Sequence, residues 1–276
     1  NKLKLKSGNS KFNLLCMPPD SFPVPEKDKN LMTFEIESSK FLKLLNKTKI
    51  SISNDETRHY LNGIYFHKTN FNKNTYLSAV ATDSHRLSSS RISIDPNINF
   101  EPIILPKKTI FQLISLLEQN NGKIEVSNNK SKIKFLVGNS LLISKVIDGR
   151  FPDYSKVVPT NNSKTLQIKL NDFKDSIERV TTVSLDHKEG LKILATKESL
   201  KLSVNNPKSG EGSENIDAKF NSDELEMSFN SRYLIDITSQ IESETIIINL
   251  KDKNSPVLIN DPSDQNSFHV VMPMKI

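Results

Sequence analysis

This 276-residue sequence has only one cysteine and no long hydrophobic run. The single cysteine, Cys16, excludes an internal disulfide framework and fits a reducing compartment, so we expect a cytoplasmic protein. No stretch approaches the roughly 18 apolar residues that cross a bilayer. The polar residues 1–10 are not followed by the apolar run of a signal peptide. Glycine and proline are not enriched, which predicts a globular protein with room for two domains.

The motifs of bond-making enzymes are also missing. The sequence has no G-x-x-x-x-G-K-S/T loop, no G-x-G-x-x-G after a strand and no G-x-S-x-G elbow. Its histidines lack metal-binding spacing, and one cysteine cannot anchor a zinc site. Asp83, Ser84 and His85 have the residue types of a hydrolytic triad, but adjacent side chains do not easily converge on one proton-transfer line. We therefore expect a binding protein without catalytic residues, cofactor or metal.

The charge balance leaves two interpretations open. The formal net charge is +6, with lysine far in excess of arginine. Such a balance suits a polyanion partner that is bound through its phosphate backbone. Codon bias toward Lys, Asn and Ile would give the same composition without any such partner.

The sequence repeats itself after a proline-rich linker at residues 17–31. FEIESSKF at 34–41 matches LQIKLNDF at 166–173, an offset of 132, and each is an alternating strand that leads into a helix. A second strand and helix follow in both copies, from residues 103 and 227, at an offset of 124. Self-similarity at this period indicates duplication of a whole domain. The predicted fold class is α+β, with two helices on mainly antiparallel sheet in each copy.

The helices are expected to be short and amphipathic. Apolar residues recur at helical spacing in each, as in Phe41, Leu44 and Leu45 of the first. Ser39 is a candidate N-cap for the first helix, Asn171 or Asp172 for the third, and Asn230 or Ser231 for the fourth.

Two groups of lysines are candidate DNA contacts. Lys40, Lys43 and Lys47 form a stripe at i, i+3 and i+7, although such a stripe is more often a solvated helix face. Lys107 and Lys108 open a helix, where the macrodipole disfavours cations by roughly 0.3–1 kcal/mol each. A pair placed against this local preference indicates an external anion, and we expect a contact that is independent of DNA sequence and sensitive to salt.

Three segments resemble bacterial DNA sliding clamps, the β subunits of DNA polymerase III. RHYLNG at 58–63 with ATDSHRL at 81–87, DGRFPDY at 148–154 and VVMPMKI at 270–276 are similar to the family's RYYLNG with ATDGHRL, DGRFPDY and VVMPMRL. Ser84 stands where the family usually has glycine, and a positive φ there would strain it. The resemblance implies that residues 1–31 are the tail and linker of a first domain, 32–158 a second and 159–276 a third. With no initiator methionine, the chain is expected to be part of a longer one.

The resemblance also implies a function. Two subunits would close head to tail into a ring around duplex DNA, without catalysis of their own. The ring would tether the replicative polymerase α subunit and dock repair polymerases and other partners through a short apolar peptide, and a clamp loader would open it. Thr182 and Val183 would lie at the subunit interface, so a chain without the first domain should be monomeric. The expected peptide pocket comprises Leu61, Thr82, His85, Arg86, Leu87, Pro152, Val157, Val270 and Met272, with Pro273 and Met274 at its rim.

Two alternatives belong to other classes. A sequence-specific DNA-binding regulator would present Arg, Asn or Gln from one helix to the major groove, and no helix here has that pattern. An esterase-like enzyme at Ser84 would lose its activity on Ser84→Ala.

Overall fold

The computed structural model describes residues 2–22, 32–184 and 190–274, and the chain forms two compact units, residues 1–31 and 32–276. The short unit is an antiparallel hairpin of β1 (Lys2–Ser7) and β2 (Ser10–Leu15), followed by the 3-10 turn η1 (Pro19–Ser21). Leu3 pairs with Leu14 and Leu5 with Phe12, so these apolar side chains share one face of the ribbon. All four are about half exposed, and this unit has no buried core of its own among the residues described.

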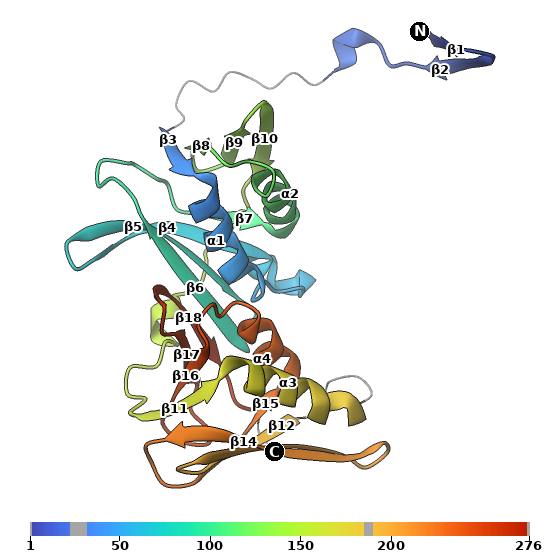
Figure 1. Cartoon of the computed structure of the whole chain (residues 1–276). Helices are drawn as coiled ribbons and strands as arrows, with labels where there is room; N and C mark the ends of the chain where they lie inside the picture. The colour runs from blue at the N-terminus through green and yellow to red at the C-terminus, as the bar shows by residue number, and fades with distance from the viewer. Residues whose placement is uncertain (1, 23–31, 185–189, 275–276) are drawn as a thin grey trace. The chain divides into compact units, whose positions relative to one another are not determined.

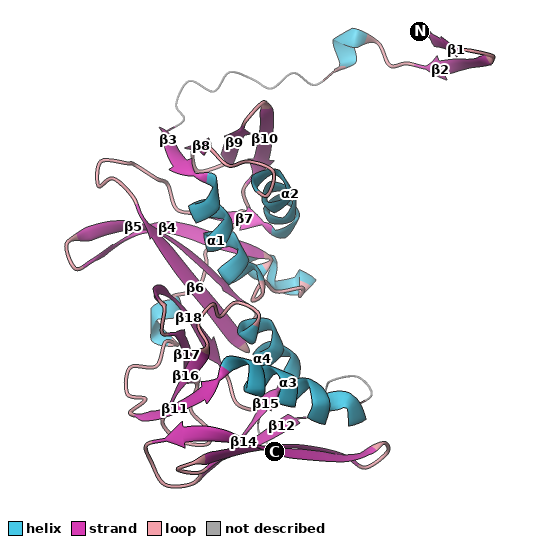
Figure 2. Ribbon diagram, in the orientation of Figure 1, coloured by secondary structure: helices cyan, strands magenta, loops and turns pink. Residues whose placement is uncertain are grey.

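The large unit contains two copies of one arrangement, which confirms the predicted α+β fold and its duplication (Figures 1 and 2). In each copy a strand runs directly into a helix, further strands follow, and a second strand and helix lead to a final antiparallel group. We call the copies the central half, from β3 to β10, and the terminal half, from β11 to β18. The central half consists of β3 (Met32–Glu37), α1 (Ser38–Lys49), η2 (Glu56–Leu61), β4 (Gly63–Phe71), β5 (Asn74–Thr82), β6 (Arg86–Ser93), β7 (Ile103–Pro106), α2 (Lys107–Leu117), β8 (Lys123–Asn128), β9 (Lys132–Val137) and β10 (Ser140–Lys145). After the turn η3 (Tyr154–Lys156), the terminal half consists of β11 (Lys164–Lys169), α3 (Leu170–Val180), η4 (Thr181–Val183), β12 (Gly190–Ala195), β13 (Ser199–Asn206), β14 (Gly210–Phe220), β15 (Leu225–Asn230), α4 (Ser231–Thr238), β16 (Thr245–Leu250), β17 (Val257–Asp261) and β18 (Asp264–Val271).

The two halves are joined edge to edge by one strand pair. β18 of the terminal half lies antiparallel to β6 of the central half, with Val270 opposite Leu87 and Ser267 opposite Ser90. This pairing makes a twelve-stranded sheet in the order β15-β12-β13-β14-β11-β16-β17-β18-β6-β5-β4-β7, and β10-β9-β8-β3 form a second sheet. We call the β6–β18 pairing and the side chains around it the junction.

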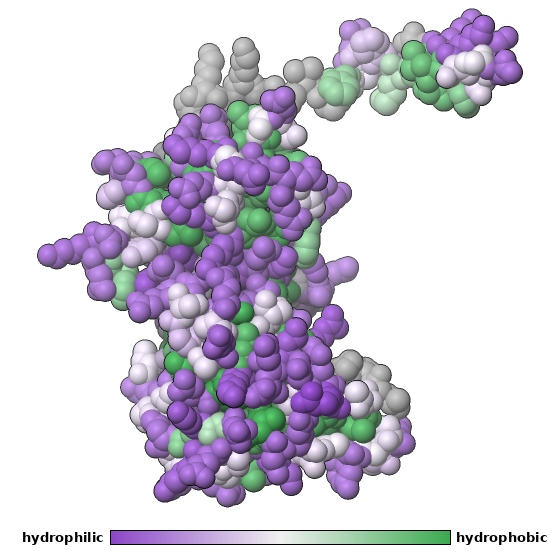
Figure 3. All heavy atoms as spheres, in the orientation of Figure 1, coloured by the Kyte–Doolittle hydropathy of each residue, from purple (hydrophilic) through white to green (hydrophobic). Residues whose placement is uncertain are grey.

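Each half has its own apolar core, because strand alternation and helix periodicity direct apolar side chains to the same side. Phe41 and Leu44 of α1 are buried in one core, and Phe173 and Ile177 of α3 are buried in the other. A smaller buried cluster lies at the junction and comprises Leu61, Val80, Leu87, Ile104, Phe151 and Val270. The visible face of the large unit is mainly hydrophilic, with apolar atoms in scattered areas (Figure 3).

The predicted helix caps were correct in one case. The Asn230 side chain accepts a hydrogen bond from the Arg232 amide at 3.0 Å, at the start of α4. The predictions for the first and third helices were wrong, because α1 begins at Ser38 after Glu37 and α3 at Leu170 after Lys169, without a side-chain cap. A strand runs straight into α1, α3 and α4 alike, and of these three helices only α4 has a side-chain cap. Within the described ranges, no helix is long and apolar enough to cross a membrane.

Candidate peptide-binding pocket

A cavity of about 230 Å³ opens at the junction, where three segments that are distant in sequence meet. The end of β5 and the start of β6 form one wall, the segment around η3 forms another, and the end of β18 closes the third. Leu87 and Val270 are 2% exposed and make an apolar floor, while Met272 and Val157, 41% and 49% exposed, stand at the opening. The lining residues are Thr82, Ser84, His85, Arg86, Leu87, Pro152, Asp153, Tyr154, Val157, Val270 and Met272.

The tight turn between β5 and β6 is built from its own polar side chains. Asp83 accepts hydrogen bonds from the His85 and Arg86 amides, both at 2.9 Å, and the Thr82 hydroxyl donates to the Arg86 carbonyl at 2.7 Å. Ser84 has φ +78°, so of the two outcomes left open for this position, strain at a positive φ is the one that applies. Its hydroxyl accepts a hydrogen bond from Arg58 at 2.6 Å, which gives the serine a partner that glycine would lack.

Backbone hydrogen bonds fix the wall that comes from the terminal half. The Met272 amide donates to the His85 carbonyl at 2.8 Å, one step beyond the β18–β6 pairing. The wall around η3 is held by Tyr154, whose hydroxyl lies 3.1 Å from Nε2 of His67. Burial raises the pKa of Tyr154 and lowers that of His67 to about 4, so both are neutral at pH 7. The pocket is therefore preformed by the fold.

Arg86 lines the pocket, but its guanidinium is bound by other groups of the protein. Its guanidinium forms ion pairs with Asp83 at 3.1 Å and with Asp236 of α4 at 2.6 Å. It also lies over the Tyr233 ring, 4.3 Å from the centroid, and the side chain is only 10% exposed. The charged end of Arg86 thus holds α4 against β6, while exposed His85 remains at the rim of the pocket.

Three of the eleven predicted pocket residues do not line the cavity. Leu61 is 2% exposed and belongs to the buried cluster beneath it. Pro273 is not among the lining residues, and Met274 lines a separate cavity of about 880 Å³ over β12 and β13. The Met274 amide donates to the Ser228 carbonyl at 2.7 Å, and this bond carries the chain away from the pocket.

Sequence reasoning missed three lining residues, Ser84, Asp153 and Tyr154. Asp153 and Tyr154 directly follow Pro152, and Ser84 precedes His85. All three could have been predicted because they are neighbours in sequence of predicted pocket residues. A hydrogen bond from the Ser155 hydroxyl lowers the pKa of Asp153, which keeps a negative charge at the rim.

The lysine stripe on α1 is not a uniform DNA-facing surface. Lys40 is exposed and pairs with Glu37 of its own chain segment at 3.0 Å. Lys43 pairs with Glu242 at 2.9 Å and Asp264 at 3.4 Å, both in the terminal half. The prediction that Lys47 contacts DNA is wrong, because this side chain is 3% exposed and its ammonium is surrounded by acceptors of the protein.

The other predicted contact residues lie at accessible places. Lys107 and Lys108 begin α2 as expected, and Lys107 donates a hydrogen bond to Asn54. Thr182 is exposed in η4, and Val183 is half-buried against the terminal core. Among the described residues no cluster of metal-ligating side chains is present.

A duplicated α+β chain whose halves join edge to edge, with an apolar pocket at that junction, belongs to the class of DNA clamps. Residues 35–153 match the family model of the DNA polymerase III beta subunit, central domain, and residues 155–275 match that of its C-terminal domain. The chain belongs to the DNA polymerase III beta subunit family, and its role is that of a sliding clamp in DNA replication.

Known relatives agree with this assignment. The beta sliding clamp of Caulobacter vibrioides is 33% identical over 276 residues, covering all of this chain and 74% of the relative. The beta sliding clamp of Escherichia coli K12 is 30% identical over 275 residues, with the same coverage of 100% and 74%. A solved structure of the DnaN sliding clamp from Bartonella birtlesii, bound to griselimycin, superposes with a TM-score of 0.95 at 36% identity, covering 100% of this chain and 74% of that one.

Proposed function

We propose that the junction pocket docks short apolar peptide segments of DNA polymerase III and of other replication and repair partners. The observation that carries this proposal is the preformed apolar floor of Leu87 and Val270 with the flexible thioether of Met272 at the opening. An extended peptide gains affinity when one or two apolar anchors lose water in such a pocket. Expected occupants are the polymerase α subunit, the clamp loader and repair polymerases. The Bartonella relative was solved with griselimycin bound, which is consistent with a ligand site in the family.

A peptide titration tests the pocket. A fluorescent Gln-Leu-x-Leu-Phe-like peptide should bind with a dissociation constant in the micromolar range, roughly −8 kcal/mol. Met272→Ala should weaken binding by about 1–2 kcal/mol, because it removes part of an anchor wall. Leu87→Ala is a poorer probe, since it opens a cavity in a buried cluster and destabilises the fold.

The matched control is Leu141→Ala, which truncates an exposed apolar side chain on β10 away from the pocket. It should leave peptide affinity unchanged. A folded wild-type chain that shows no anisotropy change at high micromolar peptide would contradict the docking role.

We further propose that the chain is an accessory subunit without catalytic residues. Ser84 accepts a hydrogen bond from Arg58, and Asp83 accepts from backbone amides of its own turn, so two of the three triad-like side chains have a structural task. Among the described residues, no side-chain hydrogen bond joins Ser84 to His85. Ester hydrolysis that disappears on Ser84→Ala would overturn this view.

Cys16, an exposed free thiol, is compatible with the cytoplasm as location.

Assembly into a head-to-tail ring is supported by the duplication itself. β6 pairs with β5 on one edge and with β18 on the other. Its counterpart β14 pairs with β13 along Gly210–Asp217, and no described strand covers the opposite edge there. A strand of a second copy would fit this edge beside Val183, and an outer edge of the β1–β2 hairpin, which pairs with no other described strand, is the candidate.

DNA contact through Lys107, Lys108 and Lys40 completes the proposal. Lys40 and Lys108 are exposed on helices α1 and α2, which lie against each other in the central half. No described helix combines exposed Arg, Asn and Gln in a pattern that reads a base sequence. The duplex should therefore be held without sequence preference.

A further inference from the structure

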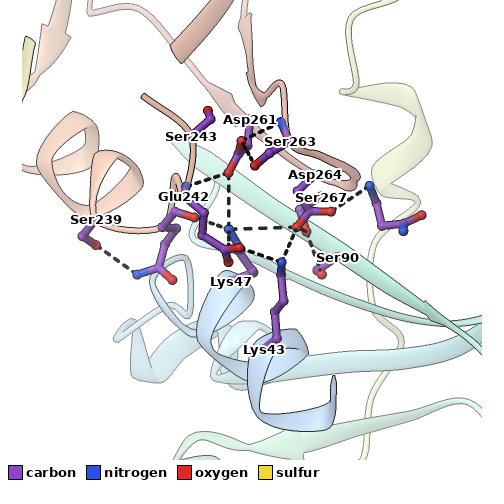
Figure 4. A network of polar contacts seen from close by, with 12 residues as sticks. Lys43, Lys47, Ser90, Ser239, Glu242, Ser243, Asp261, Ser263, Asp264 and Ser267 are labelled. Carbon is purple, nitrogen blue, oxygen red and sulfur yellow. Dashed lines mark hydrogen bonds and ion pairs between the residues drawn. The ribbon is translucent and has the colours of Figure 1, made fainter. Parts of the chain in front are cut away.

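Lys47 is the most deeply buried lysine among the described residues and spans the junction (Figure 4). Its ammonium donates a hydrogen bond to the Gln240 carbonyl and lies 3.1 Å from the Glu242 carboxylate. Asp261 and Asp264 follow at 3.8 and 4.0 Å. Lys47 belongs to α1 of the central half, and all four partners belong to the terminal half. One side chain therefore ties the two halves together from inside.

The surrounding carboxylates are themselves held in place. Asp261 accepts hydrogen bonds from the Glu242 amide at 2.7 Å and the Ser263 hydroxyl at 2.6 Å. Burial raises its pKa, but these hydrogen bonds outweigh burial and lower it to about 2. Asp264 accepts from the Ser267 hydroxyl at 3.0 Å, and the oxygen of that hydroxyl lies 2.8 Å from the Ser90 hydroxyl of β6. We call Lys43, Lys47, Glu242, Asp261 and Asp264 the junction cluster.

The cluster carries two ammonium groups and three carboxylates, so each charge depends on the others. Burial lowers the pKa of Lys43, but its hydrogen bond to Glu242 and the charge of Asp264 outweigh this and raise it. Lys43 and Glu242 are about half exposed, whereas Lys47, Asp261 and Asp264 are buried, so removing Lys47 takes the only buried cation away from two buried carboxylates of the cluster. The loss of Lys47 would leave Asp261 and Asp264, 2% and 8% exposed at their side chains, facing Glu242 without their central cation.

The duplicated position has no such arrangement. Phe41 of α1 corresponds to Phe173 of α3 at an offset of 132, so Lys47 corresponds to Arg179. Arg179 is 58% exposed and pairs with Glu214 of the same half at 2.6 Å. A buried cation that contacts acceptors of the other half is therefore found at Lys47 and not at the equivalent position of the terminal half. It is a feature of the junction and not of the repeated domain.

We propose that Lys47 is a positioning residue that latches the β17–β18 hairpin onto α1 and so keeps β18 in register on β6. The Asp261–Asp264 turn is the tip of that hairpin, and Val270 and Met272 lie at its far end, in the pocket wall. Because β18 is one continuous strand, a turn held by Lys47 fixes where Val270 meets Leu87. The effect on the pocket rests on the proposed function, whereas the effect on strand pairing does not.

Amide hydrogen exchange of the whole chain tests the latch directly. Lys47→Met keeps the aliphatic length and removes the charge. Protection of the β6 and β18 amides should fall about tenfold or more relative to wild type. Lys40→Met is the matched control, on the same helix but exposed and paired only with Glu37, and should leave protection unchanged. Equal protection in both variants would overturn the proposal. If Lys47→Met does not fold, Lys43→Met should give a smaller loss at the same strands, and no loss there counts against the latch.

Charge rescue separates a latch from simple packing. Adding Asp264→Asn to Lys47→Met removes one repelling carboxylate and keeps an acceptor for Ser267, so protection should be partly restored. The charged or titratable groups that face the site are Lys43, Glu242, Asp261, Asp264, His269 and Arg86. Absence of any rescue would show that Lys47 only fills space.

Peptide binding provides the second readout. Lys47→Met should weaken binding of the Gln-Leu-x-Leu-Phe-like peptide about fivefold without touching the pocket, and Lys40→Met should not. A wild-type chain that binds no peptide, together with loss and rescue of β6–β18 protection, would refute the proposed pocket and leave the latch standing. Unchanged peptide affinity in Lys47→Met would overturn the link between latch and pocket wall.

Discussion

At the scale of single residues, Ser84 combines an unfavourable backbone conformation with a useful hydroxyl. A non-glycine residue at φ +78° is strained by roughly 1 kcal/mol, whereas glycine is not. Ser84→Gly and Ser84→Ala both lose the hydrogen bond from Arg58, but only Ser84→Ala keeps a Cβ at this φ. We expect the glycine variant to be more stable than the alanine variant by about 1 kcal/mol, measured by urea unfolding. Equal stabilities would mean that the turn relaxes to another conformation.

His269 makes stability depend on pH. It is 2% exposed at the junction, and its Nδ1 lies 2.8 Å from the Ser88 hydroxyl. Burial lowers its pKa to about 3, and the charges of Lys47 and Arg86 act in the same direction. The folded chain therefore keeps His269 neutral, while the unfolded chain takes up a proton below about pH 6.5. The contribution of His269 to the free energy of unfolding is fully present above pH 6.5 and is lost as the pH falls toward 3.

Urea midpoints at pH 7.5, 6 and 5 measure this contribution. His269→Gln should be less stable than wild type at pH 7.5, with a smaller further loss on acidification, because the titrating group is gone. His59→Gln, which changes an exposed histidine, should keep the wild-type pH dependence. If His269→Gln and wild type lose stability in parallel, the imidazole is not neutralised by the fold.

Residue-scale prediction from sequence succeeded where the neighbours in sequence determine the geometry. The Asn230 cap depends on the local chain alone. Lys47 was misassigned because its partners lie about 190 or more residues away, in Gln240, Glu242 and Asp261. Helical spacing shows which residues share a face, but not what packs against that face.

At the scale of elements, α2 places two lysines at its N-terminus. Lys107 and Lys108 follow Pro106, which supplies no side-chain cap, and the Lys107 amide donates to the Asn62 carbonyl at 3.0 Å. The logarithm of the binding constant for a short duplex falls linearly with the logarithm of the salt concentration. If both lysines touch phosphate, replacing them with alanine should make the slope of this line shallower by about two units. Affinity should fall by the same factor for duplexes of different sequence.

Lys130→Ala with Lys145→Ala is the control for this experiment, because it removes two exposed lysines outside any helix. The control pair should lower affinity only slightly and keep the slope. A slope unchanged by the Lys107 and Lys108 replacements would show that these lysines are solvated surface, with Lys107 occupied by Asn54.

Periodicity and repetition in the sequence were sufficient to predict the elements and their order. Alternation such as that of β12, with every second residue buried, indicates a strand that is apolar on one side, and the offsets of 132 and 124 showed that two copies exist. The pairing of β18 with β6 was not predicted, because Val270 and Leu87 are 183 residues apart and neither strand shows which edge it offers. The three walls of the pocket come together only through that pairing. The pocket residues were therefore predicted from the resemblance to sliding clamps, and local sequence patterns could not have predicted them.

At the scale of the whole molecule, the duplication leaves two matching surfaces without a partner in the described chain. One is the free edge of β14 along Gly210–Asp217, and the other is an outer edge of the β1–β2 hairpin. A surface and its complement on the same chain generate heterologous contacts, which close into rings when the rotation permits. The chain spans about three quarters of the length of its relatives, and every described residue of the hairpin unit is exposed. An isolated two-stranded ribbon binds weakly for want of a supporting core.

We therefore expect the 276-residue chain to sediment as a monomer at micromolar concentration, with β14 open. Hydrogen exchange compares the twin strands within one molecule. β6 is paired on both edges, so its amides should be protected, whereas β14 should exchange faster along Gly210–Asp217. Val183→Glu should change neither the monomer mass nor this pattern, because half-buried Val183 borders an edge that has no partner in solution. A stable dimer that dissociates on Val183→Glu, with β14 protected as strongly as β6, would show that the hairpin alone closes the subunit interface.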